Sequence, residues 1–493
     1  MRSVIIYFLL LHCYVQTFAQ YHDNVMVLGY RYGLNGPVPV WDFTYGHPDT
    51  GAIFAPMDLY DCNASICDNQ GLFQMYTNGI HLANRFQQII PGSEDFNGDT
   101  VSNYYNTDYW VFPQSVLILP APGNPDLYYL FHMNGQFFSN NLIQPGRLGC
   151  SIVDMSMNGG QGQMIVKDQT VYSGGLLYST MHAVKHANGR DWWIVVHEFA
   201  SNGFATLLLT PDGVQGNSLS VAGPMLPSGF LGESVFSPDG EKYAIAYADS
   251  NKLLLYSFDR CTGTFVFDTL VQKTYDPNGF NFVGCSFSPD SRFLYASDYM
   301  NLYQYDLHSG DVPGSEKHIA TKDLISDPFP AYFGRHCLGP DGKIYIATGN
   351  ACQHYHVIND PNQMDTRCNF VQHQQKLINY GNSLPLFPNF RLGAMHGSVC
   401  DSLISGVVEN SFSDDYRIFP NPVRTFFDVT VPEEILVQEV EISNSLGQKM
   451  AVPIFYRENG GNVQGDASQL SPGVYFVAIR TKNSIQVKRF IKE

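Results

Sequence analysis

Apolar and polar residues alternate along much of the chain with the period of two that is typical of β-strands. The alternation is clearest near the end of the chain, in residues 426–431, 437–442 and 474–479, which turn-forming residues separate. Such a pattern predicts a small antiparallel β-sandwich of the immunoglobulin type. We expect this sandwich to occupy residues 413–493 as a separate domain.

The central part of the chain repeats a turn that is followed by a strand. Ser-Pro-Asp-Gly at residues 237–240 returns as Ser-Pro-Asp-Ser and as Gly-Pro-Asp-Gly, so that Pro238, Pro289 and Pro340 stand 51 residues apart. Proline presets φ, aspartate bonds its own backbone and glycine tolerates positive φ, so each copy predicts a tight turn between strands. Looser copies near residues 68, 124 and 187 bring the number of units to six.

A repeat of about 50 residues with several strands in each copy is typical of β-propeller blades. The length of residues 20–412 accommodates seven such blades. We expect the strand at residues 25–30 to share a blade with a strand near residues 390–400, because such closure hides edge strands. The predicted fold is therefore all-β, a seven-bladed β-propeller followed by a small immunoglobulin-like sandwich.

Composition supports this fold and narrows the choice of partners. Charged residues make up 15% of the chain and aromatic residues 14%, which favours strands over helices. The 28 basic and 45 acidic residues give a net charge of −17, which argues against nucleic acid as a partner. Only ten of the acidic residues lie in residues 413–493, so the acidity belongs to the propeller.

The first 19 residues predict a secretory signal peptide. Arg2 precedes an apolar run at residues 4–11, and small residues at Thr17 and Ala19 indicate cleavage before Gln20. The apolar run is too short to span a membrane, and we expect no transmembrane segment elsewhere. The mature protein is therefore predicted to be exported.

Ten cysteines occur in the chain, and nine remain after Cys13 is removed with the signal peptide. An exported protein can keep disulfides, although the odd number leaves at least one thiol without a partner in the chain. Cys62 and Cys67 are the nearest pair and could staple a loop. The alternative is that the thiols are buried as small apolar groups.

Four short motifs near the C-terminus occur in a fixed order. Their central residues are Pro420, Asn421, Pro422, Gly447, Gly473, Tyr475, Lys488 and Lys492. Together they resemble the C-terminal (type A) sorting domain of cargo of the type IX secretion system of Bacteroidetes. The resemblance implies that the type IX secretion machinery is a partner and that the tail is an export address. It also implies passage through the periplasm and the outer membrane, so that the protein is secreted or placed on the outer cell surface. It implies nothing about what the rest of the chain does.

The repeat units carry a second resemblance. Phe-Ser-Pro-Asp-Ser-Arg-Phe-Leu-Tyr-Ala at residues 287–296, followed by Leu-Tyr-Gln-Tyr-Asp-Leu at residues 302–307, is similar to the repeat of lactonase-like (YVTN) and TolB-like propellers. The resemblance implies a propeller and leaves the chemistry open.

The densest group of candidate catalytic residues contains His182, His186 and His197, followed by Glu198. Side chains four apart in a strand share a face, so His182 and His186 could bind zinc or act as acid and base. The alternative, which we favour, is that these histidines pack between blades or bond to backbone groups.

Two further groups have the composition of metal sites. Asp95, Asn97 and Asp99 place oxygen ligands at alternate positions, as calcium prefers, although a solvated loop gives the same pattern. A second group has soft ligands that could hold zinc, although a disulfide or buried thiols fit an exported protein better. This group consists of His336, Cys337, Cys352, His354 and His356. We expect no cofactor, and calcium at Asp95, Asn97 and Asp99 is the alternative.

The sequence favours a non-enzymatic propeller that binds an extracellular ligand, glycan or protein. The alternative is a hydrolase or lyase that acts on lactones or polysaccharides at the mouth of the central channel. A channel lined by glycine and apolar groups would favour the binding module. Converging histidine, aspartate and glutamate side chains would favour the enzyme.

Overall fold

The computed structural model describes residues 20–493 with gaps, so the predicted signal peptide lies outside the described residues. The gaps comprise residues 30–35, 99–100, 102–111, 138–142, 228–231, 327, 386, 402–416, 431–436, 445–448, 457–461 and 482–484. The chain divides into two compact units, residues 1–403 and 404–493.

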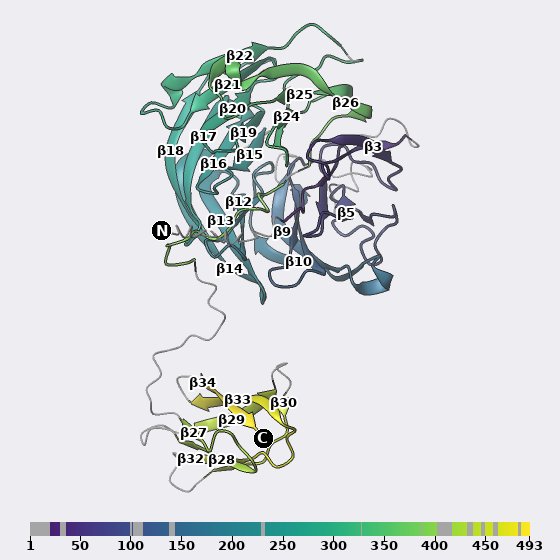
Figure 1. The fold of residues 1–493 in the computed structure, drawn as a ribbon. Coiled ribbons are helices and arrows are strands. Elements are labelled where there is room, and N and C mark those ends of the chain that lie inside the picture. Colours follow the sequence, from purple (N-terminus) through teal and green to yellow (C-terminus); the bar gives the residue numbers. More distant parts are fainter. Residues whose placement is uncertain are drawn as a thin grey trace, which may run out of the picture. The chain divides into compact units, whose positions relative to one another are not determined.

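The described part of the first unit forms seven antiparallel sheets, which we number as blades in chain order (Figure 1). The first blade consists of β1 (Val25–Val27), β2 (Val38–Asp42) and β3 (Asp49–Ile53). The second consists of β4 (Ala64–Cys67), β5 (Phe73–Thr77) and β6 (Leu82–Asn84). The third consists of β7 (Val116–Pro120), β8 (Leu127–Phe137), β9 (Ile143–Asp154) and β10 (Gln163–Ser173).

The remaining four blades have four strands each. The fourth consists of β11 (His182–Lys185), β12 (Trp192–His197), β13 (Ser201–Thr210) and β14 (Gly213–Leu226). The fifth consists of β15 (Glu233–Phe236), β16 (Lys242–Tyr247), β17 (Lys252–Asp259) and β18 (Thr264–Gln272). The sixth consists of β19 (Gly284–Phe287), β20 (Phe293–Ser297), β21 (Asn301–Asp306) and β22 (Lys317–Thr321). The seventh consists of β23 (His336–Leu338), β24 (Ile344–Ile346), β25 (Cys352–Ile358) and β26 (Phe370–Gly381).

Each blade is a meander whose strands pair in chain order. The first strands of the first three blades contact one another in order, as do those of the fourth to seventh blades, and the latter four line a central cavity. The seven sheets of the described part thus form an all-β propeller, the fold class that the sequence predicts. Four short 3₁₀ turns also occur in the described residues, and they are η1 (Met157–Gly159), η2 (Ala248–Ser250), η3 (Pro313–Ser315) and η4 (Asp365–Cys368).

All six repeat units place their turn between the first and second strands of a blade, as the sequence predicts. The hydrogen bonds explain the repeated Ser-Pro-Asp. Ser237 Oγ donates to Asp239 Oδ1 at 2.5 Å and accepts the backbone N–H of Lys242 at 2.9 Å. Ser288 makes the equivalent bonds to Asp290 and to the N–H of Phe293. The repeated residues therefore fix the geometry of the turn.

Aromatic packing between the seventh and first blades closes the ring. The ring of Trp41, which is fully buried, lies 4.8 Å from that of Tyr345 and 5.6 Å from that of Tyr355. At the rim, Thr50 donates to the carbonyl oxygen of Lys376 at 3.2 Å. Burying such large side chains is the main favourable contribution to closure.

The prediction of a shared blade at the closure is wrong. β1 pairs with β2 in a blade of its own, and residues 390–400 contain no strand. Residues 387–401, which we call the strap, instead run across the side of the propeller that carries the repeat turns. Asn389 donates to the carbonyl oxygen of Pro238 at 2.6 Å, and Met395 donates to that of Ala187 at 2.8 Å. A disulfide joins Cys400 to Cys261 in the fifth blade. The strap bonds to turns of several blades, so its backbone groups do not pair along a strand edge.

The second unit is a sandwich of two four-stranded sheets. One sheet has the order β27 (Arg417–Phe419), β28 (Phe426–Thr430), β32 (Asn462–Asp466) and β31 (Ile454–Tyr456). The other has the order β30 (Lys449–Met450), β29 (Val437–Asn444), β33 (Gly473–Thr481) and β34 (Ile485–Lys492). Apolar residues from both sheets, among them Phe427, Val477 and Phe490, form its core.

Candidate functional site

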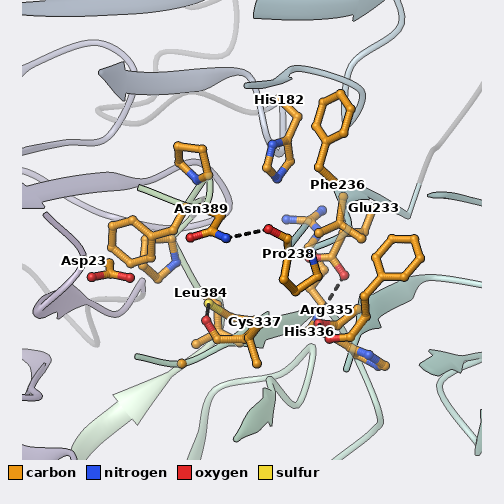
Figure 2. A pocket seen from close by; sticks show the side chains of 18 of the residues that line it. Asp23, His182, Glu233, Phe236, Pro238, Arg335, His336, Cys337, Leu384 and Asn389 are labelled. Carbon is orange, nitrogen blue, oxygen red and sulfur yellow. Dashed lines mark hydrogen bonds between the residues drawn. The ribbon is translucent and has the colours of Figure 1, made fainter. Parts of the chain in front are cut away.

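A cavity of about 250 Å³ occupies the central channel of the propeller (Figure 2). Its walls include residues of β11, β15, β19 and β23, the first strands of the fourth to seventh blades. Residues just before β4 and β7 complete the walls. Towards the repeat turns, Pro238, Pro289 and Pro340 line the cavity together with Phe387 and Asn389 of the strap. The strap therefore borders the cavity on the turn side.

Glu233, at the start of β15, joins three consecutive blades. Its Oε2 accepts the backbone N–H groups of Cys285 and His336, each at 2.9 Å. Burial raises the pKa of the Glu233 carboxyl to about 8, although both backbone bonds and Arg335 favour the charged form. At neutral pH the group is thus mainly a protonated carboxylic acid, which can donate as well as accept a hydrogen bond.

Gln114 makes a comparable connection among the third, fourth and fifth blades. Its Nε2 donates to the carbonyl oxygens of Ser234 at 2.6 Å and of Met181 at 3.2 Å. Its Oε1 accepts the N–H of Ser234 at 3.1 Å. Two polar side chains therefore hold the inner strands of five consecutive blades in register around the cavity.

Arg335 brings a positive charge to the wall of the cavity, which the carboxyl of Asp61 also lines. Its Nε donates to the carbonyl oxygen of Gly232 at 3.2 Å and its Nη1 to that of Asp61 at 3.4 Å. Burial raises the pKa of the Asp61 carboxyl, and the charge of Arg335 opposes that rise. Among the described residues, Nη2 of Arg335 has no hydrogen-bond partner. It is free to bind an oxygen of a ligand.

Two neutral imidazoles line the same cavity. Burial lowers the pKa of His182 to about 4 and that of His336 to about 3. Nε2 of His336 bonds to Ser297 Oγ at 2.9 Å, whereas Nδ1 has no partner among the described residues. Nδ1 of His182 lies 2.9 Å from the backbone nitrogen of Ala183, and its Nε2 has no partner in the described part. Both rings therefore retain an unused nitrogen at neutral pH.

Of the three predicted catalytic histidines, only His182 reaches the channel. His186 follows β11 and packs against Trp193, with a ring separation of 5.5 Å. His197, on β12, is fully buried, and its ring meets that of Phe204 at 4.5 Å. Its Nδ1 bonds to the carbonyl oxygen of Glu198 at 2.7 Å. Both side chains thus pack against aromatic rings and do not line the channel cavity.

The candidate metal ligands do not gather into a site in the described residues, which contain no group of three or more potential ligands. Asn97 is fully buried, and its side chain bonds to the carbonyl oxygen of Met133 at 3.0 Å and to His132 at 3.1 Å. Asp95 lies in an exposed turn, and Asp99 falls outside the described residues. Among the candidate zinc ligands, the thiol of Cys352 donates to the carbonyl oxygen of Phe329.

The proposed staple between Cys62 and Cys67 is wrong, because both thiols are free and buried. Their side chains serve packing, and Cys62 lies 3.4 Å from Ser115 Oγ. The one disulfide in the described residues joins Cys261 to Cys400. The other described cysteines are likewise buried, namely Cys150, Cys285, Cys337, Cys352 and Cys368.

Sequence reasoning missed Glu233, Arg335, Asp61 and Gln114, although the repeat contained a signal for two of them. His182, Glu233, Gly284 and Arg335 stand 51 residues apart, each five or so residues before a repeat turn. They occupy equivalent positions at the start of four consecutive inner strands. A Cβ on Gly284 would lie 2.1 Å from the carbonyl oxygen of Gly334, so that position has no room for a side chain. The ring thus holds an imidazole, a carboxyl and a guanidinium.

In the second unit, three of the predicted sorting residues have defined contacts. Asn421 Oδ1 accepts the N–H of Ile491 at 2.9 Å. The hydroxyl of Tyr475 donates to the carbonyl oxygen of Ser471 at 2.9 Å, and Lys492 is buried. Pro420 and Pro422 flank Asn421, Gly473 begins β33, Lys488 lies on β34, and Gly447 is outside the described residues. The bond between Asn421 and Ile491 attaches the first sorting motif to β34, the last strand.

Residues 417–493 match the family described as the secretion system C-terminal sorting domain. The tail is a sorting domain of this family. The protein is therefore cargo of the type IX secretion system, and its sorting domain directs it to the cell surface or outside the cell. No described helix is long and apolar enough to cross a membrane. No curated protein matches the chain.

The propeller that precedes the sorting domain is similar to solved structures at low identity. A putative 6-phosphogluconolactonase from Bacteroides uniformis is 12% identical, with a TM-score of 0.43 over 73% of this chain and 98% of that one. The periplasmic gluconolactonase of Pseudomonas aeruginosa is 11% identical, with a TM-score of 0.42 over 73% and 98%. The propeller domain of Cps50 from Myceliophteria thermophila is 11% identical, with a TM-score of 0.36 over 66% and 90%. Likenesses this distant carry no inference about a substrate.

Proposed function

We propose that this type IX cargo is a binding propeller whose channel takes a small polar ligand with a carboxylate or a polarised carbonyl. The observation that carries the proposal is the ring of His182, Glu233 and Arg335 around one cavity. Each of these side chains brings a polar group to the wall of the cavity. Arg335 supplies a cation, Glu233 a protonated carboxyl, and His182 an uncharged imidazole.

Histidine, aspartate and glutamate side chains do converge on the channel, among them His182, Asp61 and Glu233, and this arrangement is the one expected of an enzyme. Binding is nevertheless favoured over covalent catalysis by the state of the nucleophiles that line the cavity. Burial holds the pKa of the Cys337 thiol well above its usual range, so the thiolate is scarce. Ser234 is occupied by Gln114, and Ser286 bonds to the carbonyl oxygen of Phe287 at 3.5 Å. No serine or cysteine that lines the described cavity bonds to an imidazole. The residues thus suit recognition better than nucleophilic attack.

One observation favours a second function, hydrolysis of a lactone or polysaccharide. A carboxyl with a pKa of about 8 in a cavity suits a general acid, and Arg335 could stabilise a developing oxyanion. Such a reaction would use Glu233 as the acid and a water molecule as the nucleophile. It would not need His186 or His197, which lie away from the cavity.

A thermal-shift screen tests the proposal. The exported protein would be screened against sugar acids, lactones, dicarboxylates and oligosaccharides, and each hit would be followed for product. We expect stabilisation without turnover that is lost in Arg335→Leu and kept in His186→Ala. Turnover that is lost in Glu233→Gln would favour the hydrolase, and shifts that survive in Arg335→Leu would refute the channel site.

We also propose that residues 1–19 are removed as a signal peptide, as the sequence predicts. The intact mass of the exported protein measures its first residue. A protein that begins at Gln20 agrees with the proposal, and retention of residues 1–19 contradicts it.

A further inference from the structure

A second cavity, of about 390 Å³, lies on the turn side of the propeller and shares no lining residue with the channel cavity. The repeat turns of the second, third and fourth blades contribute Asn69, Pro122, Asn124 and Arg190 to its wall. Lys185, the last residue of β11, and Trp192, the first of β12, lie behind them. We call this space the turn-side cavity.

Lys185 is an unusual group to find in such a place. Its side chain is 3% exposed, and its Nζ lies 4.0 Å from the centre of the Trp192 ring. Its hydrogen bond in the described residues is a long one, 3.4 Å, to the carbonyl oxygen of Arg190. Burial lowers the pKa of this amine to about 7, against the attraction of Asp191. A buried ammonium without a carboxylate partner is costly, and an anion beside it would remove that cost.

The carboxylates that could pair with Lys185 are bonded to other groups. The carboxylate of Asp191 accepts hydrogen bonds from Nε of Arg190 at 2.7 Å and from Nδ2 of Asn188 at 2.8 Å. Asp68, on the turn of the second blade, accepts backbone N–H groups of its own turn, including that of Leu72 at 3.0 Å. Asp23 is paired with Arg391 of the strap. None of these groups neutralises Lys185 by direct contact.

The other groups near Lys185 add positive charge or none. Arg260 donates to the carbonyl oxygens of Lys185 at 2.9 Å and of Gly393 at 2.6 Å, and it forms no salt bridge in the described residues. His22 bonds through Nδ1 to the carbonyl oxygen of Cys67 at 2.6 Å, and burial lowers its pKa to about 4, so it is neutral. In a chain of net charge −17, this is a local excess of positive charge.

One further hydrogen-bond donor in a residue that lines the turn-side cavity lacks a partner in the described part of the chain, namely Nε1 of Trp192. We propose that the turn-side cavity binds a small organic or inorganic anion, a carboxylate or a phosphate, through the ammonium of Lys185. A carboxylate or phosphate oxygen accepts charge-assisted hydrogen bonds from an ammonium.

Binding of an anion couples to protonation of Lys185. The anion favours the charged amine, so the complex holds a proton that about half of the free protein lacks near pH 7. Affinity is therefore highest below pH 7 and falls by up to about tenfold per pH unit above it. A site built from arginine alone would show no such dependence in this range.

Calorimetric titration of the full chain with succinate and with inorganic phosphate, at pH 6, 7, 8 and 9, tests the proposal. We expect one of the two anions to bind, with affinity that weakens above pH 7, and the pair distinguishes a carboxylate site from a phosphate site. Lys185→Met should abolish binding. Lys322→Met is the matched control, since Lys322 also lies near an aromatic ring, that of Tyr332, at 5.4 Å.

A second measurement needs no variant and so does not depend on the folding of Lys185→Met. Competitive acetylation of the native protein, read by peptide mapping, reports the reactivity of each lysine. Lys185 should be protected by the bound anion, and Lys322 should not. Absence of binding by both anions, or equal binding in Lys185→Met, overturns the proposal.

Discussion

Oε2 of Glu233 accepts the backbone N–H of His336 at 2.9 Å, although the two residues are 103 apart in the sequence. The bond joins the inner strands of the fifth and seventh blades, and the same oxygen holds Cys285 of the sixth. A single side chain therefore has two roles, because it connects the inner strands of three blades and also lines the cavity.

The first prediction concerns the pH dependence that follows from Glu233. Its pKa is 4.5 in an unperturbed chain and about 8 in the folded protein. Between these values the unfolded chain has lost the proton that the folded protein keeps, so stability falls as pH rises. The loss is at most about 1.4 kcal/mol per pH unit, and it levels off above pH 8.

Glu233→Gln keeps an oxygen that can accept both N–H groups and removes the ionisation. We expect the variant to gain stability relative to wild type from pH 5 to pH 8, measured by urea unfolding at each pH. If the unfolding free energies of the two proteins changed with pH in the same way, the buried and protonated state of Glu233 would be contradicted.

Trp41 is predicted to be critical for closing the ring between the first and seventh blades. Trp41→Ala removes a fully buried ring that packs on Tyr345 and Tyr355. The expected loss of unfolding free energy is about 3–5 kcal/mol. Tyr45→Ala is the control, because Tyr45 is 79% exposed and its removal should cost little. Similar effects of the two variants would argue against this closure.

The disulfide between Cys261 and Cys400 anchors the strap to the fifth blade. Replacing both cysteines by serine should lower the unfolding free energy by about 2–4 kcal/mol, measured by denaturant titration. A reductant should destabilise the wild type by a similar amount and leave the double variant unchanged. If reduction left the wild type unaffected, the strap would be held by its hydrogen bonds alone.

Export depends on the sorting domain. Removal of residues 413–493 should leave the propeller in the periplasm, as measured by fractionation and immunoblotting of cells. Tyr475→Ala, which removes the hydroxyl bond to Ser471 and the ring stacked on Phe490, should reduce export through misfolding of the sandwich. Normal surface delivery of the truncated chain would contradict the role of the tail.

The repeat predicted the blades because its residues act locally. Ser237 and Asp239 fix a turn through neighbours in the chain, so their pattern identifies the turn without any knowledge of the fold. The sandwich was predictable for the same reason, since its alternating strands are short-range signals.

The closure and the site depend on contacts between distant residues. Asn389 bonds to Pro238, and Arg335 donates to Asp61 across a sequence distance of 274, which no local pattern reveals. His182 was singled out for its neighbours His186 and His197, but it reaches the channel because it begins an inner strand. The 51-residue register that relates it to Glu233 and Arg335 was present in the sequence and would have identified both.

The central claim is that the channel binds a ligand through Arg335 and Glu233, and calorimetric titration of the best hit from the ligand screen tests it most directly. Wild type, Arg335→Leu and Glu233→Gln would be titrated together, with Arg292→Leu as a control because Arg292 pairs with Asp306 away from the cavity. We predict that Arg335→Leu weakens binding at least tenfold, that Glu233→Gln weakens it less, and that Arg292→Leu binds as wild type does. Equal affinity in all four proteins would contradict the channel site.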